Sequence, residues 1–142
     1  MSIETLVAEQ FLNARLRADT TLVSLLSDGA NGIYTDVLPV QAGYPAVQVV
    51  YYSGADLTHL GNAHIWSDLY YIVRGVCEGG SFVPLSEIAK RLTAALDNAE
   101  GNTSSGTVFG VVRTGPFRMA EADGERQFRH LGGYFRIFAK ES

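Results

Sequence analysis

The sequence is poor in cysteine, in lysine and in long apolar runs. Its one cysteine, Cys77, can form neither an intramolecular disulfide nor a cysteine-based metal site. No apolar run approaches the roughly 20 residues that a membrane-spanning helix needs. The first residues, MSIETLVAEQFL, lack a basic stretch ahead of an apolar one, so we expect no signal peptide. These absences predict a protein that stays in a reducing cytosol or joins an assembly built there.

Basic residues are also too few for a tight nucleic-acid ligand. The chain has 11 lysines and arginines against 15 aspartates and glutamates, which gives a formal net charge of −4. Proteins that grip DNA carry a surplus of cations, because these neutralise phosphates and release counterions. We therefore expect no tight binding of DNA, although an acidic protein can surround DNA without gripping it.

What is present is the composition of one globular domain. The 142 residues are 46% hydrophobic and 18% charged, which is typical of a folded soluble chain. A chain of this length buries about 68% of its unfolded surface on folding. That is enough for one core without disulfides or metals, so we expect a single domain over residues 1–142.

The N-terminal region predicts a pair of helices. Residues 3–17 have Ser2 as a candidate N-cap, and Asp19 is a candidate cap for a second, short helix over residues 20–27. The apolar stripe of the first helix is expected at Ile3, Leu6, Val7, Phe11 and Ala14, with Leu12 and Leu16 off it.

A third, amphipathic helix is predicted over residues 84–98. Pro84 suits the first helical position, and the polar run GNTSSG at 101–106 is expected to end the helix as a loop. Its core stripe consists of Leu85, Ile88, Ala89, Leu92, Ala95 and Leu96.

β-Branched and aromatic residues predict strands over residues 33–38, 44–52, 64–76, 107–113, 117–121 and 127–139. Residues 53–62 (SGADLTHLGN) are expected to form a long hairpin loop, and Asp123–Gly124 a tight turn. Gly132–Gly133 indicates a bulge or a close approach of two backbones. The order ααβββαβββ has no βαβ repetition. We therefore predict an α+β fold, with a mostly antiparallel sheet, an N-terminal helix pair and one central amphipathic helix packed on it.

The strand over residues 64–76 has two different faces, and neither is wholly polar. Alternation places Ile65, Leu69, Tyr71 and Val73 on one face, and Trp66, Asp68, Tyr70 and Arg74 on the other. We expect one face on the core and the other partly covered, with a neighbouring subunit as a candidate cover.

Motifs for catalysis or phosphate binding are incomplete. GNTSSG imitates the front of a phosphate-binding loop, but Thr107 and Val108 stand where lysine and serine or threonine belong, and the run follows a helix. Ser81 lacks the strand–turn–helix elbow of a nucleophile. Glu121, Asp123 and Glu125 are explained as a solvated turn, and Cys77 as a buried thiol. We expect no catalytic residue and no cofactor.

The histidines do not have the spacing of a zinc site. His59 and His64 are five residues apart in a turn-rich segment, whereas a helical zinc site has a spacing of four. A loop metal site with Asp56 or Asp68 is conceivable, but a surface histidine pair explains the residues better. We expect no metal.

An excess of aromatic residues points to protein contacts. Tyr51, Tyr52, Trp66, Tyr70 and Tyr71 lie on two adjacent predicted strands. Tyrosine and tryptophan are enriched at protein–protein interfaces, while cover by helices of the same chain is the alternative. The candidate oligomer or partner interface consists of Tyr51, Asp56, His59, His64, Trp66 and Tyr70.

Several segments, taken in order, resemble the tail-terminator, or tail-completion, family of long-tailed bacteriophages. They are RADTTLVSLLSDGANGIYTDVLP, GYPAVQVVYY, HIWSDLYYIVRGVCE, PLSEIAKRLTAALD and DGERQFRHLGGYFRIF, which together span about residues 14–139. In that family a helix pair leads to a short "IY" strand, a "YP" start opens a strand, and one amphipathic helix ends near "ALD".

The resemblance implies a structural virion protein without enzymatic turnover, assembled in the host cytoplasm. It would form a ring, usually a hexamer, that caps the tail tube, ends its elongation and joins it to the head-side connector. Its partners would be further copies of itself, the tail tube protein and a head-completion protein, with DNA passing through the lumen and no membrane involved. The alternatives are another head–tail connector or tail-tube component, or a small ligand-binding domain or enzyme using His64 or Asp68 in a cleft.

Overall fold

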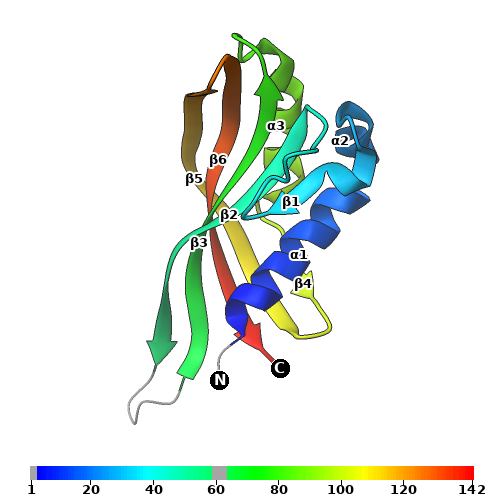
Figure 1. Ribbon diagram of the computed structural model, residues 1–142. Coiled ribbons are helices and arrows are strands. Elements are labelled where there is room, and N and C mark those ends of the chain that lie inside the picture. Colours follow the sequence, from blue (N-terminus) through cyan, green and yellow to red (C-terminus); the bar gives the residue numbers. More distant parts are fainter. Residues whose placement is uncertain (1–2, 59–63) are drawn as a thin grey trace.

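A single six-stranded sheet organises the chain in the computed structural model, which describes residues 3–58 and 64–142 (Figure 1). The strands are β1 (Ile33–Thr35), β2 (Ala46–Thr58), β3 (His64–Glu78), β4 (Gly101–Asn102), β5 (Gly106–Asp123) and β6 (Arg126–Glu141). Their order across the sheet is β1-β2-β3-β6-β5-β4, and only the β1–β2 pair is parallel. The predicted α+β class with a mostly antiparallel sheet is confirmed.

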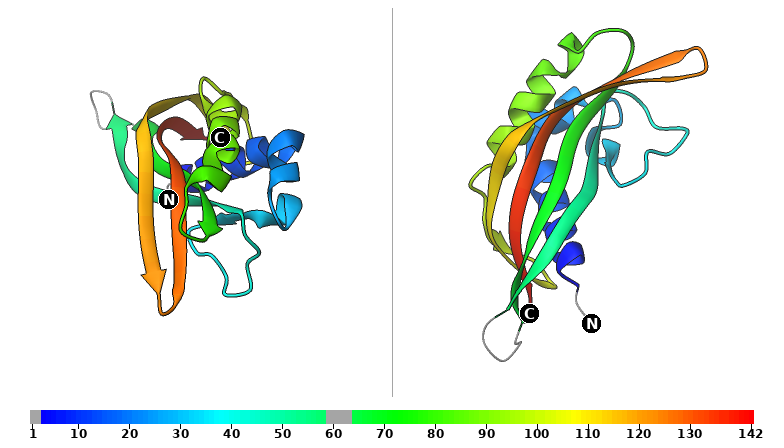
Figure 2. Two further views of the ribbon diagram at one scale, coloured as in Figure 1. Left: turned by 90° about the horizontal axis from the view of Figure 1, so that it is seen from above. Right: turned by 90° about the vertical axis from the view of Figure 1, so that its left-hand side faces the viewer.

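All helices lie on one face of this sheet (Figure 2). They are α1 (Glu4–Ala18), α2 (Thr20–Leu25) and α3 (Ser86–Leu96), with short 3₁₀ turns at η1 (Gly29–Gly32) and η2 (Val83–Leu85). α1 and α3 contact the central strands β3 and β6. The core between the layers combines Leu12, Leu16, Ile88 and Leu92 from the helices with Tyr71, Val73, Phe135 and Ile137 from the strands.

The helix predictions hold in position more than in detail. Asp19 caps α2 as expected, because its carboxylate accepts a hydrogen bond of 3.0 Å from the Leu22 amide. In α1, however, Leu12 and Leu16 are fully buried while Leu6 and Ala14 are exposed, so the predicted stripe is partly wrong. α1 lies over the strands along much of its length and is buried over a broader arc than one narrow stripe. Ser2, the predicted cap, lies outside the described residues.

α3 has its predicted core stripe, but its bounds differ from the prediction at both ends. Pro84 lies in the 3₁₀ turn η2, and the regular helix starts at Ser86 and ends at Leu96. The following GNTSSG run is not simply a loop. Gly101–Asn102 forms the edge strand β4, which pairs with Thr107–Val108 of β5.

Three strand predictions are wrong. Residues 53–58 continue β2 rather than forming a loop, since they pair with β3 from Ser53↔Tyr70 to Thr58↔His64. The two strands predicted at 107–113 and 117–121 are one strand, β5, whose register shifts between Val108 and Gly110 and between Arg113 and Gly115. β1 ends at Thr35, three residues early. In the first two cases pairing with a long neighbour overrides local glycine, proline and aspartate signals. β1 ends early because Asp36 adopts a left-handed backbone conformation, with φ of 63°.

Candidate functional site

The sheet face that the helices leave uncovered carries many aromatic side chains. We call it the open face and define it by Tyr52, Trp66, Asp68, Tyr70, Ile72, Arg74, Phe109, Val112, Phe117, Tyr134, Arg136 and Phe138. In the right-hand view of Figure 2, β2, β3, β6 and β5 lie in front of the helices. An antiparallel sheet with one free face normally shows polar residues there. An aromatic free face therefore marks a candidate contact surface.

The aromatic rings of the open face contact one another edge-on. Trp66 and Phe109 have ring centres 6.2 Å apart, and Tyr134 lies 5.7 Å from Tyr52 and 5.6 Å from Phe117. Tyr52 is nevertheless 61% exposed and Phe109 48% exposed. The face thus offers large rings held in place by their neighbours, which lose little conformational entropy on binding a partner.

The charged groups of the open face are paired within the face. The Arg136 guanidinium donates two hydrogen bonds to the Asp68 carboxylate, at 2.8 and 2.6 Å, which raise the pKa of Arg136. The Arg74 guanidinium donates two to Gln48 Oε1, at 3.1 and 2.9 Å, and lies 5.1 Å from the Phe117 ring centre. Because these cations already have partners, the open face suits a protein surface better than a phosphate backbone.

One buried histidine lies beside the open face, near the β5–β6 turn. His130 is 1% exposed, and its Nε2 lies 2.6 Å from Glu121 Oε1. Burial lowers the pKa of His130, and the hydrogen bond with Glu121 opposes this only in part. Within the described residues His130 Nδ1 is buried without a hydrogen-bond partner. The imidazole is therefore best accommodated neutral, with its proton on Nε2.

The structure divides the predicted interface residues between the two faces of the sheet. Trp66 and Tyr70 lie on the open face, as the alternation of the strand predicts. Tyr51 and Asp56 pair with Tyr71 and Ser67 and so lie on the helix-covered face. His59 lies outside the described residues, and so does the side chain of His64. Among the described side chains, Tyr51 and Asp56 therefore do not share a surface with Trp66 and Tyr70.

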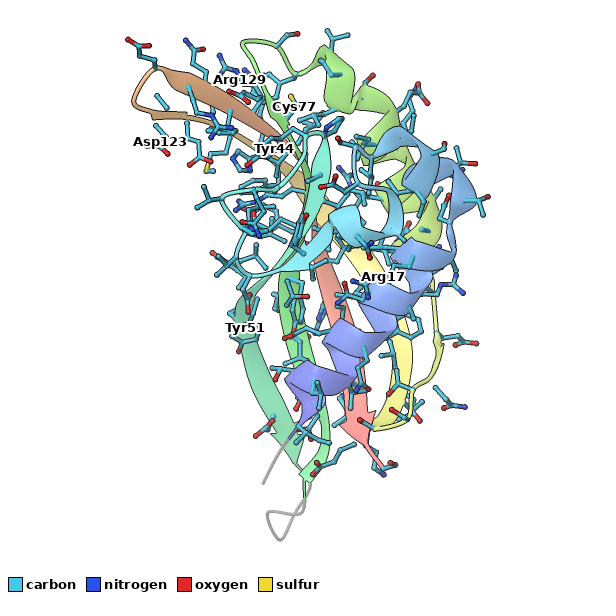
Figure 3. All side chains as sticks on the ribbon, turned by 45° about the vertical axis from the view of Figure 1, so that its right-hand side comes forward. Arg17, Tyr44, Tyr51, Cys77, Asp123 and Arg129 are labelled. Carbon is cyan, nitrogen blue, oxygen red and sulfur yellow. The ribbon has the colours of Figure 1, made fainter. Side chains whose placement is uncertain are left out.

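Tyr51 and Asp56 border a shallow hollow beside the start of α1. The hollow is lined by Glu4, Thr5, Tyr51, Gly54, Ala55, Asp56, Ser67 and Leu69. Tyr51 (Figure 3) packs edge-on against Tyr71 with ring centres 5.6 Å apart, and Ser67 Oγ donates to Asp56 Oδ1 at 2.7 Å. Tyr71 in turn donates to Glu9 Oε2 at 2.7 Å, and burial raises its pKa far above the ordinary value. This is a structural tyrosine that stays protonated.

The two aspartates weighed for metal binding lie apart, whereas the two candidate nucleophiles are neighbours, with Cys77 Sγ 3.6 Å from the Ser81 carbonyl oxygen. Asp56 and Asp68 lie on opposite faces of the sheet, and no group of three metal-ligating side chains occurs among the described residues. Ser81 Oγ accepts a hydrogen bond of 3.1 Å from the Val83 amide at the start of η2. Cys77 is buried, as predicted, and burial raises the pKa of its thiol. In the part of the chain that the structure describes, no helix is both long and apolar enough to cross a membrane.

Sequence reasoning missed half of the open face. It found the aromatic residues of β2 and β3 but not Phe109, Phe117, Tyr134 and Phe138, which come from β5 and β6. The alternation of Tyr134, Arg136 and Phe138 along β6 was the available signal. What the sequence does not contain is the pairing of β6 with β3, which brings Arg136 to Asp68.

The fold has a counterpart among solved structures, although the sequence does not. No protein-family model matches the chain, and no curated protein is similar to it in sequence. A protein chain in the virion of a native gene transfer agent (GTA) particle has a similar structure, with a TM-score of 0.73. The similarity covers 100% of both chains at 16% sequence identity. At this level of identity the similarity establishes a shared fold over the full length of the chain.

Proposed function

We propose that the protein is a structural virion protein, and that it acts as the tail terminator of a phage-like particle. It forms a ring, a hexamer in this proposal, that caps the tail tube, stops its elongation and joins it to the head-side connector. The observation that carries the proposal is the full-length structural similarity to a chain of the gene transfer agent virion. Because that similarity spans both chains completely, the whole fold, and not one motif, supports the assignment.

The order of segments that resembles tail terminators is also the order of elements in the fold. The helix pair joined at Asp19 leads to β1 with its Ile33–Tyr34 pair, and β2 begins directly after Tyr44–Pro45. α3 ends at Leu96, within the ALD motif. This agreement supports the family assignment independently of the comparison with the gene transfer agent.

A ring of identical subunits needs two different patches on each copy, because each contact is head-to-tail. The open face around Trp66 and Tyr70 supplies one patch. The other side of the same strands, around Tyr51 and Asp56, supplies a second patch that faces the opposite way. In the proposed ring the open face of one copy therefore meets the helix side of the next. The net charge of −4 also suits a wall past which DNA moves without sticking.

Mass measurement by light scattering on the purified protein tests the ring, and electron microscopy with tail tubes tests the role. We expect a closed oligomer of defined mass, flat rings in the images, and attachment at one end of each tube. A protein that stays monomeric at every concentration would overturn the ring. Addition of the protein along open-ended tubes would identify a tube subunit, and rings that bind only the head side would identify another connector component.

A further inference from the structure

The hairpin of β5 and β6 has two oppositely charged sides. It projects beyond the helices (Figure 2), and residues on its two sides alternate by strand geometry. The pairs Arg118↔Leu131 and Ala120↔Arg129 lie on the helix side. The pairs Glu121↔Phe128 and Asp123↔Arg126 lie on the open side.

On the helix side, two guanidinium groups converge on one ring. The guanidinium carbons of Arg118 and Arg129 lie 4.4 and 5.7 Å from the centre of the Phe82 ring. Among the described residues the Arg129 guanidinium donates only to the Phe128 carbonyl and to Gln127 Oε1, at 3.3 and 3.4 Å. Arg118 makes no hydrogen bond or ion pair within the described residues, and neither arginine has a carboxylate partner there. Like charges gathered without a counter-ion leave a site that favours an acidic group.

On the open side and at the turn, carboxylates are in excess. Glu121, Asp123 and Glu125 are exposed. Glu121 Oε1 already lies 2.6 Å from His130 Nε2, and Arg126 is held by Glu78 through hydrogen bonds of 3.0 and 3.1 Å. Asp123 and Glu125 form no ion pair among the described residues. Arg129 and Asp123 extend to different sides of the hairpin ribbon (Figure 3).

We propose that the Arg118–Phe82–Arg129 site of one copy receives the acidic side of the same hairpin, Asp123 with the adjacent turn residue Glu125, from the next copy. The inference rests on the proposed ring and specifies its contact. The occupant is a second copy because the charge that the site lacks is presented on the other side of the same hairpin. A contact between two different sides of one element is head-to-tail, so it propagates around a ring instead of closing as a two-fold dimer. Half-buried Phe82 and exposed Val83 provide the apolar centre between the charges.

Charge reversal on each side tests the contact. The variant R118E/R129E carries acid on both sides of the hairpin, and D123R/E125R carries an excess of base on both. Each alone is expected to associate on the order of 100-fold more weakly than the wild type in light scattering. An equimolar mixture of the two variants is expected to restore rings, because each then finds the opposite charge in its neighbour. The control is K90E/K140E, which reverses two exposed cations elsewhere and should leave the rings intact.

Each outcome has one meaning. Restoration in the mixture but not in the separate variants supports the contact. Rings that persist in R118E/R129E overturn the contact and leave the tail-terminator proposal standing. Loss of rings without restoration, in variants whose thermal unfolding matches the wild type, also overturns it. A wild-type protein that is monomeric overturns the ring and the contact together.

Discussion

Gly132 of β6 lies directly against the backbone of Val73 in β3. A Cβ atom on Gly132 would overlap the carbonyl oxygen of Val73 and crowd the Cα of Arg74. The two central strands therefore approach closely here, and the Arg74 side chain has room to reach Phe117 across the neighbouring strands. The sequence predicted either a bulge or a close approach at Gly132–Gly133. The structure has the close approach, with unbroken pairing to β3 through this position.

Gly132→Ala should therefore destabilise the fold. Overpacking of this kind costs about 1–3 kcal/mol, and the clash is with backbone, which cannot rotate away. Chemical denaturation measures the free energy of unfolding. Gly110→Ala in β5 is the matched control, since nothing lies within 4 Å of the added Cβ there. Equal losses for the two variants would contradict the close approach as the cause.

His130 should make the protein less stable in mild acid. Its pKa in the fold lies below the ordinary value of 6.5 because the ring is buried. The unfolded chain therefore binds the proton more readily, and the free energy of unfolding falls as the pH drops below about 6.5. For one site the slope is at most about 1.4 kcal/mol per pH unit. His130→Gln should flatten the dependence of the free energy of unfolding on pH between pH 8 and pH 5. An unchanged slope would mean that other groups cause the loss of stability in acid.

Asp19 combines a helix cap with an ion pair, and two substitutions separate them. Its carboxylate accepts from the Leu22 amide and lies 2.6 Å from Arg91 Nη2 of α3. Asp19→Ala removes both interactions and should cost about 1–2 kcal/mol. Asp19→Asn keeps an N-cap and should cost less. Thermal unfolding of both variants measures the stability that each loses relative to the wild type. Equal losses of stability would mean that the ion pair, not the cap, stabilises α2.

Trp66 and Tyr71 lie on opposite sides of β3 and should respond differently to truncation. Trp66→Ala or Tyr70→Ala should weaken ring formation by about 2 kcal/mol, a change in affinity of roughly 30-fold, while the monomer stays folded. Tyr71→Ala should instead lower the unfolding temperature, because Tyr71 is fully buried and bonded to α1. Light scattering and circular dichroism on the same samples separate the two effects. Unfolding of the Trp66 variant would assign that residue to the core.

Elements with a strong local pattern were predictable from sequence. α3 has a clean apolar stripe, and the alternation of β3 correctly separated Tyr71 and Val73 from Trp66 and Tyr70. Local signals failed where a neighbouring strand sets the structure. Ser53–Thr58 contains glycine and aspartate that favour a turn, yet β3 pairs with it from Ser53↔Tyr70 to Leu57↔Trp66.

Of the open face, only the residues of β2 and β3 could be predicted, again because a local pattern does not specify neighbouring strands. The alternation of side chains along a strand shows which of its residues share a face, but it does not show which strands lie side by side. The neighbours of β3 are β2 and β6, so Asp68 meets Arg136 from a segment 68 residues away. The Arg118–Phe82–Arg129 site likewise joins a connection before α3 to the last hairpin.

The central position of β6 has a consequence for the order of folding. This strand is the last of the sheet in sequence, and it joins the β1–β2–β3 half to the β5–β4 half. On a ribosome the two halves are made first, each with an unpaired edge, and neither can complete the sheet until β6 has emerged. Such long-range closure slows folding and leaves strand edges open to aggregation in the meantime. Synthesis of the final strand is therefore the step at which the chain acquires a protected sheet.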